Sequence, residues 1–108
     1  MKIHILGIGG TFMAGIAIIA KQLGHEVTGS DKNLYDPMKT VLENSGINYT
    51  EGYKSNILNK SFDLIIVGNV MSRGMPIIEK LLRTNIKYIS GPQWLYENVL
   101  NNKFVIAV

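Results

Sequence analysis

A glycine-rich segment near the amino terminus has the residue types and spacing of a phosphate-binding turn. It follows a short apolar run at residues 2–6 and reads Gly7-Ile8-Gly9-Gly10-Thr11-Phe12-Met13-Ala14-Gly15. The first glycine permits a tight turn, and the second lets the backbone approach a phosphate. Amides at the start of a following helix would add donors and the positive end of its dipole. The segment therefore predicts a site for the diphosphate of a nucleotide-type ligand, although the same glycines could serve only as a tight turn.

Phe12 departs from the usual dinucleotide pattern, because it stands where that pattern has its third glycine. That glycine allows the helix to pack closely on the strand. We therefore expect the phenylalanine to hold the helix further from the strand, which counts against an ordinary NAD site.

A serine and an acidic residue form a second candidate element. Ser30-Asp31 follows the glycine segment by roughly the 20 residues after which an acidic side chain meets a ribose hydroxyl in dinucleotide-binding proteins. The alternative is that Asp31 caps a turn, which is common for Ser-Asp before a loop.

A third element directly follows the clearest candidate for a buried strand, residues 62–67, in which the last four residues are apolar. It reads Gly-Asn-Val-Met-Ser-Arg-Gly-Met-Pro over residues 68–76. Asn69 and Ser72 could exchange hydrogen bonds with a ligand, and Arg73 could face a phosphate or carboxylate. Arg73 could equally be an exposed surface residue.

Composition excludes several other classes of protein. The 108 residues, 46% hydrophobic and 18% charged, suit one globular domain, and the net charge of +3 comes from scattered Lys and Arg without a nucleic-acid-binding run. Without cysteine there is neither a disulfide framework nor a thiolate metal site. His4 and His25 lack metal-ligand spacing and are interpreted as packing residues. No apolar stretch is long enough to cross a membrane, and the ATP-binding pattern GxxxxGK[ST] is absent.

Strand and helix patterns alternate along the chain. Strands are predicted at 2–6, 25–29, 47–49, 62–67 and 86–89, and helices at 13–23, 38–44, 77–85 and from Pro92 to Leu100, with Asp36 starting the second helix. Right-handed crossovers between such units predict an α/β fold: a Rossmann-like open parallel sheet of about five strands with helices on both faces. Ligands of such sheets bind at the carboxyl ends of the strands, where all three candidate elements would lie.

Three segments in this order carry a resemblance to a known family. GIGGTFMAGIAIIAKQLGHEVTGSD, VGNVMSRGMPIIEKLL and SGPQWLYENVL resemble the amino-terminal domain of the Mur ligases, in particular the branch that attaches a ready-made peptide. The resemblance implies a cytoplasmic bacterial enzyme of peptidoglycan recycling. Such an enzyme uses ATP and Mg²⁺ to join L-alanyl-γ-D-glutamyl-meso-diaminopimelate to UDP-N-acetylmuramate.

The resemblance also implies how the parts are divided. Residues 1–102 would bind the UDP-sugar, and residues 103–108 would begin an ATP-binding central domain that this chain lacks. The fragment alone would then be inactive and would bind neither ATP nor Mg²⁺. The implied UDP-sugar contacts are Gly7, Gly9, Gly10, Thr11, Phe12, Met13, Ser30, Asp31, Asn69, Val70, Met71, Ser72 and Arg73.

Two other function classes remain open on the residues alone. One is a NAD(P)-binding domain of an oxidoreductase or of a nucleotide-sensing regulator, with Asp31 on the adenosine ribose. The other is a non-catalytic module that docks a partner through a helical face that includes Trp94.

Overall fold

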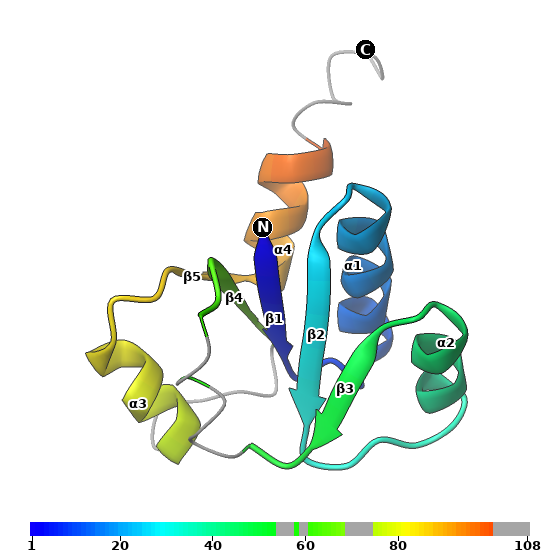
Figure 1. Cartoon of the computed structure of the whole chain (residues 1–108), viewed down its shortest axis with the longest axis horizontal. Helices are drawn as coiled ribbons and strands as arrows, with labels where there is room; N and C mark the ends of the chain where they lie inside the picture. The colour runs from blue at the N-terminus through cyan, green and yellow to red at the C-terminus, as the bar shows by residue number, and fades with distance from the viewer. Residues whose placement is uncertain (54–57, 59–60, 69–74, 101–108) are drawn as a thin grey trace.

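A five-stranded, wholly parallel sheet organises the chain (Figure 1). The computed structural model describes residues 1–53, 58, 61–68 and 75–100. The strands lie in the order β3-β2-β1-β4-β5. Their bounds are β1 (Lys2–Leu6), β2 (Glu26–Asp31), β3 (Asn48–Glu51), β4 (Leu64–Val67) and β5 (Tyr88–Ser90). The predicted Rossmann-like α/β fold is confirmed.

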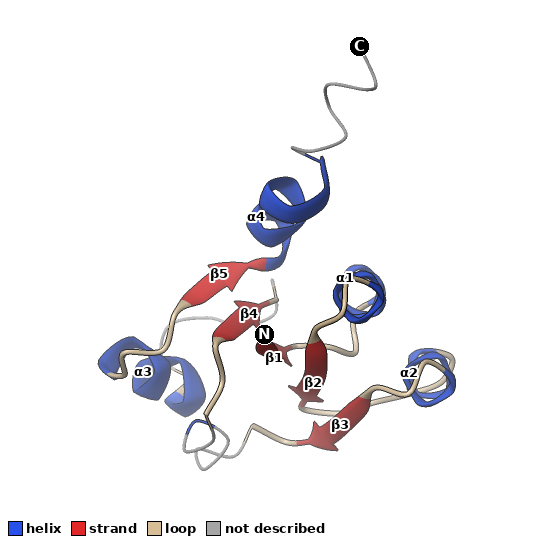
Figure 2. Cartoon of the chain, turned by 45° about the horizontal axis from the view of Figure 1, so that its top comes forward, coloured by secondary structure: helices blue, strands red, loops and turns tan. Residues whose placement is uncertain are grey.

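Helices cover both faces of this sheet (Figure 2). They are α1 (Thr11–Gln22), α2 (Met38–Asn44), α3 (Pro76–Arg83) and α4 (Gly91–Leu95), and a π-helical turn, η2 (Tyr96–Leu100), continues α4. Their ends follow from local chemistry. Gly24, at φ 96°, terminates α1, Pro76 is the first residue of α3, and the Ser90 hydroxyl caps α4 by accepting from the amide of Gln93.

Alternate residues of the central strands supply two separate cores. Ile3 and Ile5 of β1 pack with α1, α2 and α4, whereas Leu6 packs with α3 on the other face. In β4, Ile66 joins the first core and Ile65 the second. β4 is therefore apolar on both faces, which explains why Leu64 to Val67 are consecutive apolar residues.

Several predicted boundaries differ from the observed ones. Helix α1 begins at Thr11 rather than at Met13, and β2 extends through Asp31 rather than ending at Gly29. Asp36 was expected to start the second helix, but Pro37 holds the N-cap position and the Asp36 carboxylate accepts instead from the Thr40 hydroxyl at 2.6 Å.

No helix in the described part of the chain is both long and apolar enough to span a membrane.

Candidate functional site

The carboxyl edge of the sheet gathers the candidate residues. The glycine turn follows β1, Asp31 ends β2, and Gly68 follows β4. Backbone hydrogen bonds join these connections: the amide of Gly7 donates to the carbonyl of Ser30 at 2.8 Å, and that of Gly68 donates to the carbonyl of Leu6 at 2.9 Å. Because all strands are parallel, segments distant in sequence meet at one edge.

The glycine turn delivers the chain into α1 with free amide groups. Gly7 adopts φ 86°, which only glycine reaches without strain, and Gly10 is the N-cap residue. The first helical hydrogen bond runs from the amide of Ala14 to the carbonyl of Gly10 at 2.8 Å. The three amides before it, those of Thr11, Phe12 and Met13, therefore have no acceptor within the helix. With no acidic residue in the first turn of α1, this end is suited to an anion.

Side chains of this turn have different roles from its amides. Met13 is buried, and a Cβ atom added to Gly91 would lie 2.6 Å from its sulfur, so its thioether fills the space beside α4. Phe12 is 47% exposed. Phe12 also belongs to neither core cluster. That Phe12 holds the helix further from the strand stays a prediction.

Asp31 lies at the centre of the described edge. Its Oδ2 accepts from the amide of Gly9 at 2.7 Å. Its Oδ1 accepts from the amide of Lys32 at 2.7 Å and from the hydroxyl of Tyr53 at 3.2 Å. The carboxylate thus connects the glycine turn, the end of β2 and Tyr53, the second residue after β3.

This contact explains why position 9 holds a glycine. A Cβ atom there would lie 2.7 Å from Oδ2 of Asp31 and 2.9 Å from Cδ2 of Leu34. The amide of Gly9 is already bonded, so a phosphate can reach it only by displacing the carboxylate. The helix-start amides of Thr11, Phe12 and Met13 do not have this competitor.

Ser30 contributes to the site through its backbone. Its side chain is fully buried, with the hydroxyl 3.0 Å from Nε2 of His4. His4 also lies with Nδ1 2.7 Å from the Thr28 hydroxyl and with its ring against Phe62. His4 is therefore a buried, hydrogen-bonded histidine within the sheet, as its interpretation as a packing residue required.

Tyr53 belongs to the site but was not predicted from the sequence. Burial, the charge of Asp31 and the hydrogen bond to that carboxylate together raise the pKa of Tyr53 to about 12. The hydroxyl therefore keeps its proton at neutral pH and acts as a donor to Asp31. The available signal was positional: Gly52-Tyr53 directly follows the strand beside β2, and the amide of Gly52 donates to the carbonyl of Asp31 at 2.6 Å.

Part of the predicted site lies outside the described residues. This applies to Asn69, Val70, Met71, Ser72 and Arg73, and also to the segment 103–108. The structure does describe Gly68, the residue directly before Asn69. Gly68 is buried beside the carbonyl of Leu6 and the side chain of Met13.

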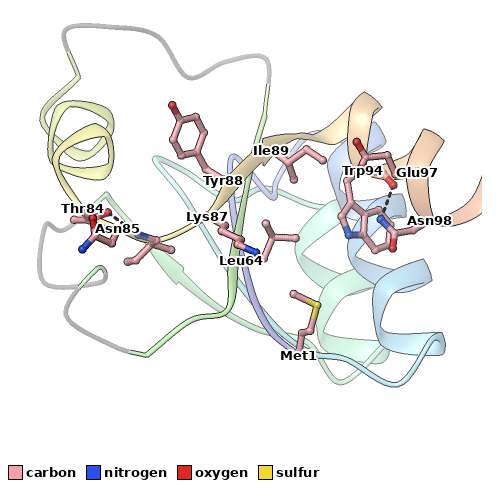
Figure 3. Close-up of a pocket in the computed structure, with 11 residues that line it drawn as sticks. Met1, Leu64, Thr84, Asn85, Lys87, Tyr88, Ile89, Trp94, Glu97 and Asn98 are labelled. Atoms are coloured by element: carbon pink, nitrogen blue, oxygen red, sulfur yellow. Dashed lines mark hydrogen bonds between the residues drawn. The ribbon is translucent and has the colours of Figure 1, made fainter.

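A cavity of about 630 Å³ lies at the opposite, amino-terminal edge of the sheet (Figure 3). Met1, Leu64 and Tyr88 line it from the starts of β1, β4 and β5, and Trp94 lines it from α4. Neither Gly9 nor Asp31 contributes to this cavity. It is therefore separate from the glycine turn, and we give it no role in nucleotide binding.

Within the described ranges, no group of three or more His, Asp or Glu side chains is arranged to hold a metal ion.

Comparison with known proteins gives a consistent family match. Residues 2–103 match the family model described as "Mur ligase family, catalytic domain". The chain is 56% identical over 108 residues to the UDP-N-acetylmuramate–L-alanyl-γ-D-glutamyl-meso-2,6-diaminoheptandioate ligase of Escherichia coli. It is 54% identical over 106 residues to the protein of the same name from Haemophilus influenzae.

A solved structure shows the same arrangement. The crystal structure of a murein peptide ligase from Psychrobacter arcticus superposes with a TM-score of 0.89 at 54% identity, covering 94% of this chain and 21% of that one. The chain spans 24% and 23% of the lengths of the Escherichia coli and Haemophilus influenzae relatives, or about a quarter.

Proposed function

The chain belongs to the Mur ligase family, and from that premise we propose that it binds UDP-N-acetylmuramate as the substrate-holding part of a murein peptide ligase. The whole enzyme would attach L-alanyl-γ-D-glutamyl-meso-diaminopimelate to UDP-N-acetylmuramate in bacterial peptidoglycan recycling. Two relatives that are more than 50% identical over the matched residues carry that activity in their names.

The observation that carries the proposal is that unbonded backbone amides, which can donate to an anion, lie near the hydrogen-bonded carboxylate of Asp31. The amides of Thr11, Phe12 and Met13 would bind the diphosphate, with Gly7, Gly9 and Gly10 shaping the turn that presents them. Asp31 would accept hydrogen bonds from the ribose or uracil of the same ligand. Ser30 would support both by holding the amide of Gly7 with its carbonyl.

The loop after β4 completes the proposed site. Asn69, Val70, Met71, Ser72 and Arg73 would line the uridine side of the crevice. The topology supports this part of the proposal, because β4 is the strand next to β1 across the point where the strand order reverses. Residues 1–102 would then form the UDP-sugar-binding unit.

ATP and Mg²⁺ do not fit the residues present. The sequence lacks the GxxxxGK[ST] pattern that cradles ATP phosphates, and the described part of the chain offers no cluster of metal ligands. We therefore place both cofactors, together with the catalytic residues, in the part of the ligase beyond residue 102. We place the reaction in the cytoplasm, where ATP is available.

Calorimetric titration with UDP-N-acetylmuramate tests the proposal, with NADH titrated in parallel. We expect saturable binding of the UDP-sugar and none of NADH. Asp31→Asn keeps the shape of the side chain but removes its charge. We expect it to weaken binding by about tenfold or more, the typical worth of a hydrogen bond to a charged group.

Asp63→Asn is the matched control for that substitution. The carboxylate of Asp63 also accepts a backbone amide, that of Lys2 at 2.7 Å, but it lies at the opposite edge of the sheet. We expect Asp63→Asn to bind normally. Binding of NADH alone would replace the proposal with a dinucleotide-binding function. If neither ligand binds, a module that docks a protein partner would be favoured.

A further inference from the structure

We propose that Tyr53 is a positioning residue for Asp31, and that its hydroxyl makes the carboxylate selective for a ribose with a free 2′-hydroxyl. The inference rests on the proposed function, since it specifies how the uridine end of that ligand is recognised. It starts from one contact, the 3.2 Å hydrogen bond from the Tyr53 hydroxyl to Oδ1 of Asp31.

The bonding capacity of the carboxylate determines where a ligand can meet it. An ionised carboxylate has about four acceptor positions. The amides of Lys32 and Gly9 occupy one position on each oxygen, and Tyr53 occupies the second position on Oδ1. The position left is on Oδ2, the oxygen that faces the glycine turn. Tyr53 thereby limits a ligand donor to the oxygen next to the proposed diphosphate site.

Tyr53 also brings an acceptor of its own. While its proton is donated to Asp31, the phenolic oxygen can still accept a hydrogen bond. The hydroxyl of Tyr53 and Oδ2 of Asp31 therefore present two acceptors on neighbouring groups. This arrangement suits the paired 2′- and 3′-hydroxyls of a ribose better than it suits a single donor.

The rest of the side chain holds this hydroxyl in place. The ring of Tyr53 is half-buried and packs against the core cluster beneath α3, which includes Leu6 and Ile65. The backbone before it is fixed by the hydrogen bond from Gly52 to the carbonyl of Asp31. Ring and backbone are both anchored, so the hydroxyl can be removed while the shape of the residue is kept.

Tyr49, which lies in β3 four residues before Tyr53, offers a matched control. Its hydroxyl donates to the carboxylate of Glu43 at 2.6 Å, a contact between β3 and the end of α2 that does not touch Asp31. Tyr49→Phe and Tyr53→Phe therefore each remove one tyrosine–carboxylate hydrogen bond, and only the second lies at the proposed site.

The experiment compares the affinities of UDP and 2′-deoxy-UDP for three forms of the chain: wild type, Tyr53→Phe and Tyr49→Phe. We expect wild type and Tyr49→Phe to prefer UDP by about tenfold or more. We expect Tyr53→Phe to bind UDP more weakly and to lose most of that preference. Thermal unfolding of each form checks that it is folded.

Each other outcome overturns the inference in a distinguishable way. If Tyr53→Phe weakens both ligands equally and keeps the ratio, Tyr53 is only structural. If wild type shows no preference for UDP, or if Tyr49→Phe also loses it, the hydroxyl of Tyr53 does not set the selectivity. A wild-type chain that binds no uridine nucleotide would overturn the proposed function as well.

Discussion

At position 9, the proposed ligand site and the fold both require glycine. The sequence pattern assigns glycine there to the approach of a phosphate. The structure adds a second reason, because any Cβ atom would collide with Oδ2 of Asp31 and with Leu34. The glycine is needed even before a ligand arrives.

Gly9→Ala tests that dual demand. We expect the carboxylate to be displaced, affinity for the UDP-sugar to fall by about tenfold or more, and the free energy of unfolding to drop by about 1 to 3 kcal/mol, as for other over-packed sites. Calorimetry and urea denaturation measure the two effects.

Gly10→Ala provides the comparison one residue further on. A Cβ atom there meets its nearest neighbour, the carbonyl oxygen of Gly7, at 3.9 Å, which is an ordinary contact. We expect Gly10→Ala to bind UDP-N-acetylmuramate much more tightly than Gly9→Ala does. Equal losses in the two variants would show that the turn tolerates no side chain at all, and the specific role of Asp31 at position 9 would be refuted.

The sequence was informative about residues whose role depends on the backbone and less informative about side-chain direction. Spacing alone located the start of α1 only to within two residues, but the turn at Gly7 and the place of Asp31 at the end of β2 were predicted from it. The directions of Phe12 and Ser30 were not, because exposure of the one and burial of the other depend on neighbours far away in the chain. Tyr53 was missed for the same reason: its partner Asp31 is 22 residues distant and is reached only through strand pairing.

Secondary structure was predicted well where a strong local signal exists. The helix 38–44 matches α2, whose end at Ser45 is followed by Gly46 at φ 72°. β2 was predicted too short because Ser30 and Asp31 are polar. They remain in the strand because their partners in β1 and β3 are hydrogen-bonded beside them, a tertiary effect that overrides propensity.

Two glycines in neighbouring elements should respond oppositely to alanine. Gly15 lies within α1 with no atom within 4 Å of an added Cβ, so Gly15→Ala should raise the free energy of unfolding by about 0.5 to 1 kcal/mol through helix propensity. Gly29 lies in β2, where an added Cβ would overlap the side chain of Ile8, so Gly29→Ala should lower it by about 1 to 3 kcal/mol.

Denaturant unfolding of both variants measures these changes. Since both substitutions are the same, a general effect of alanine on the unfolded chain cannot produce opposite signs. Destabilisation by Gly15→Ala would mean that α1 packs more closely on its surroundings than the structure shows.

The stability of the whole molecule should depend on two tyrosines at high pH. The hydrogen bond from Tyr49 to Glu43 and the burial of Tyr53 beside Asp31 raise both pKa values from 10.0 to about 12. Above pH 10 the unfolded chain loses these protons while the folded chain keeps them. The folded state is therefore penalised, and its stability falls as pH rises from about 10 to about 12.

Urea unfolding between pH 9 and about 12 checks this dependence. The double variant Tyr49→Phe/Tyr53→Phe should flatten the slope, because neither residue then titrates in either state. An unchanged slope would assign the alkaline loss of stability to other groups.

The position of β1 in the middle of the sheet has a consequence for synthesis. Of the five strands, β1 is translated first, but one of its two partners, β4, begins only at Leu64, whose register partner is Ile3. Until that residue emerges, β1 can pair only with β2, and its other edge stays open for more than half of the time needed to translate these 108 residues. Since unpaired apolar strands aggregate, the nascent chain passes through a period in which a chaperone has a defined strand edge to protect.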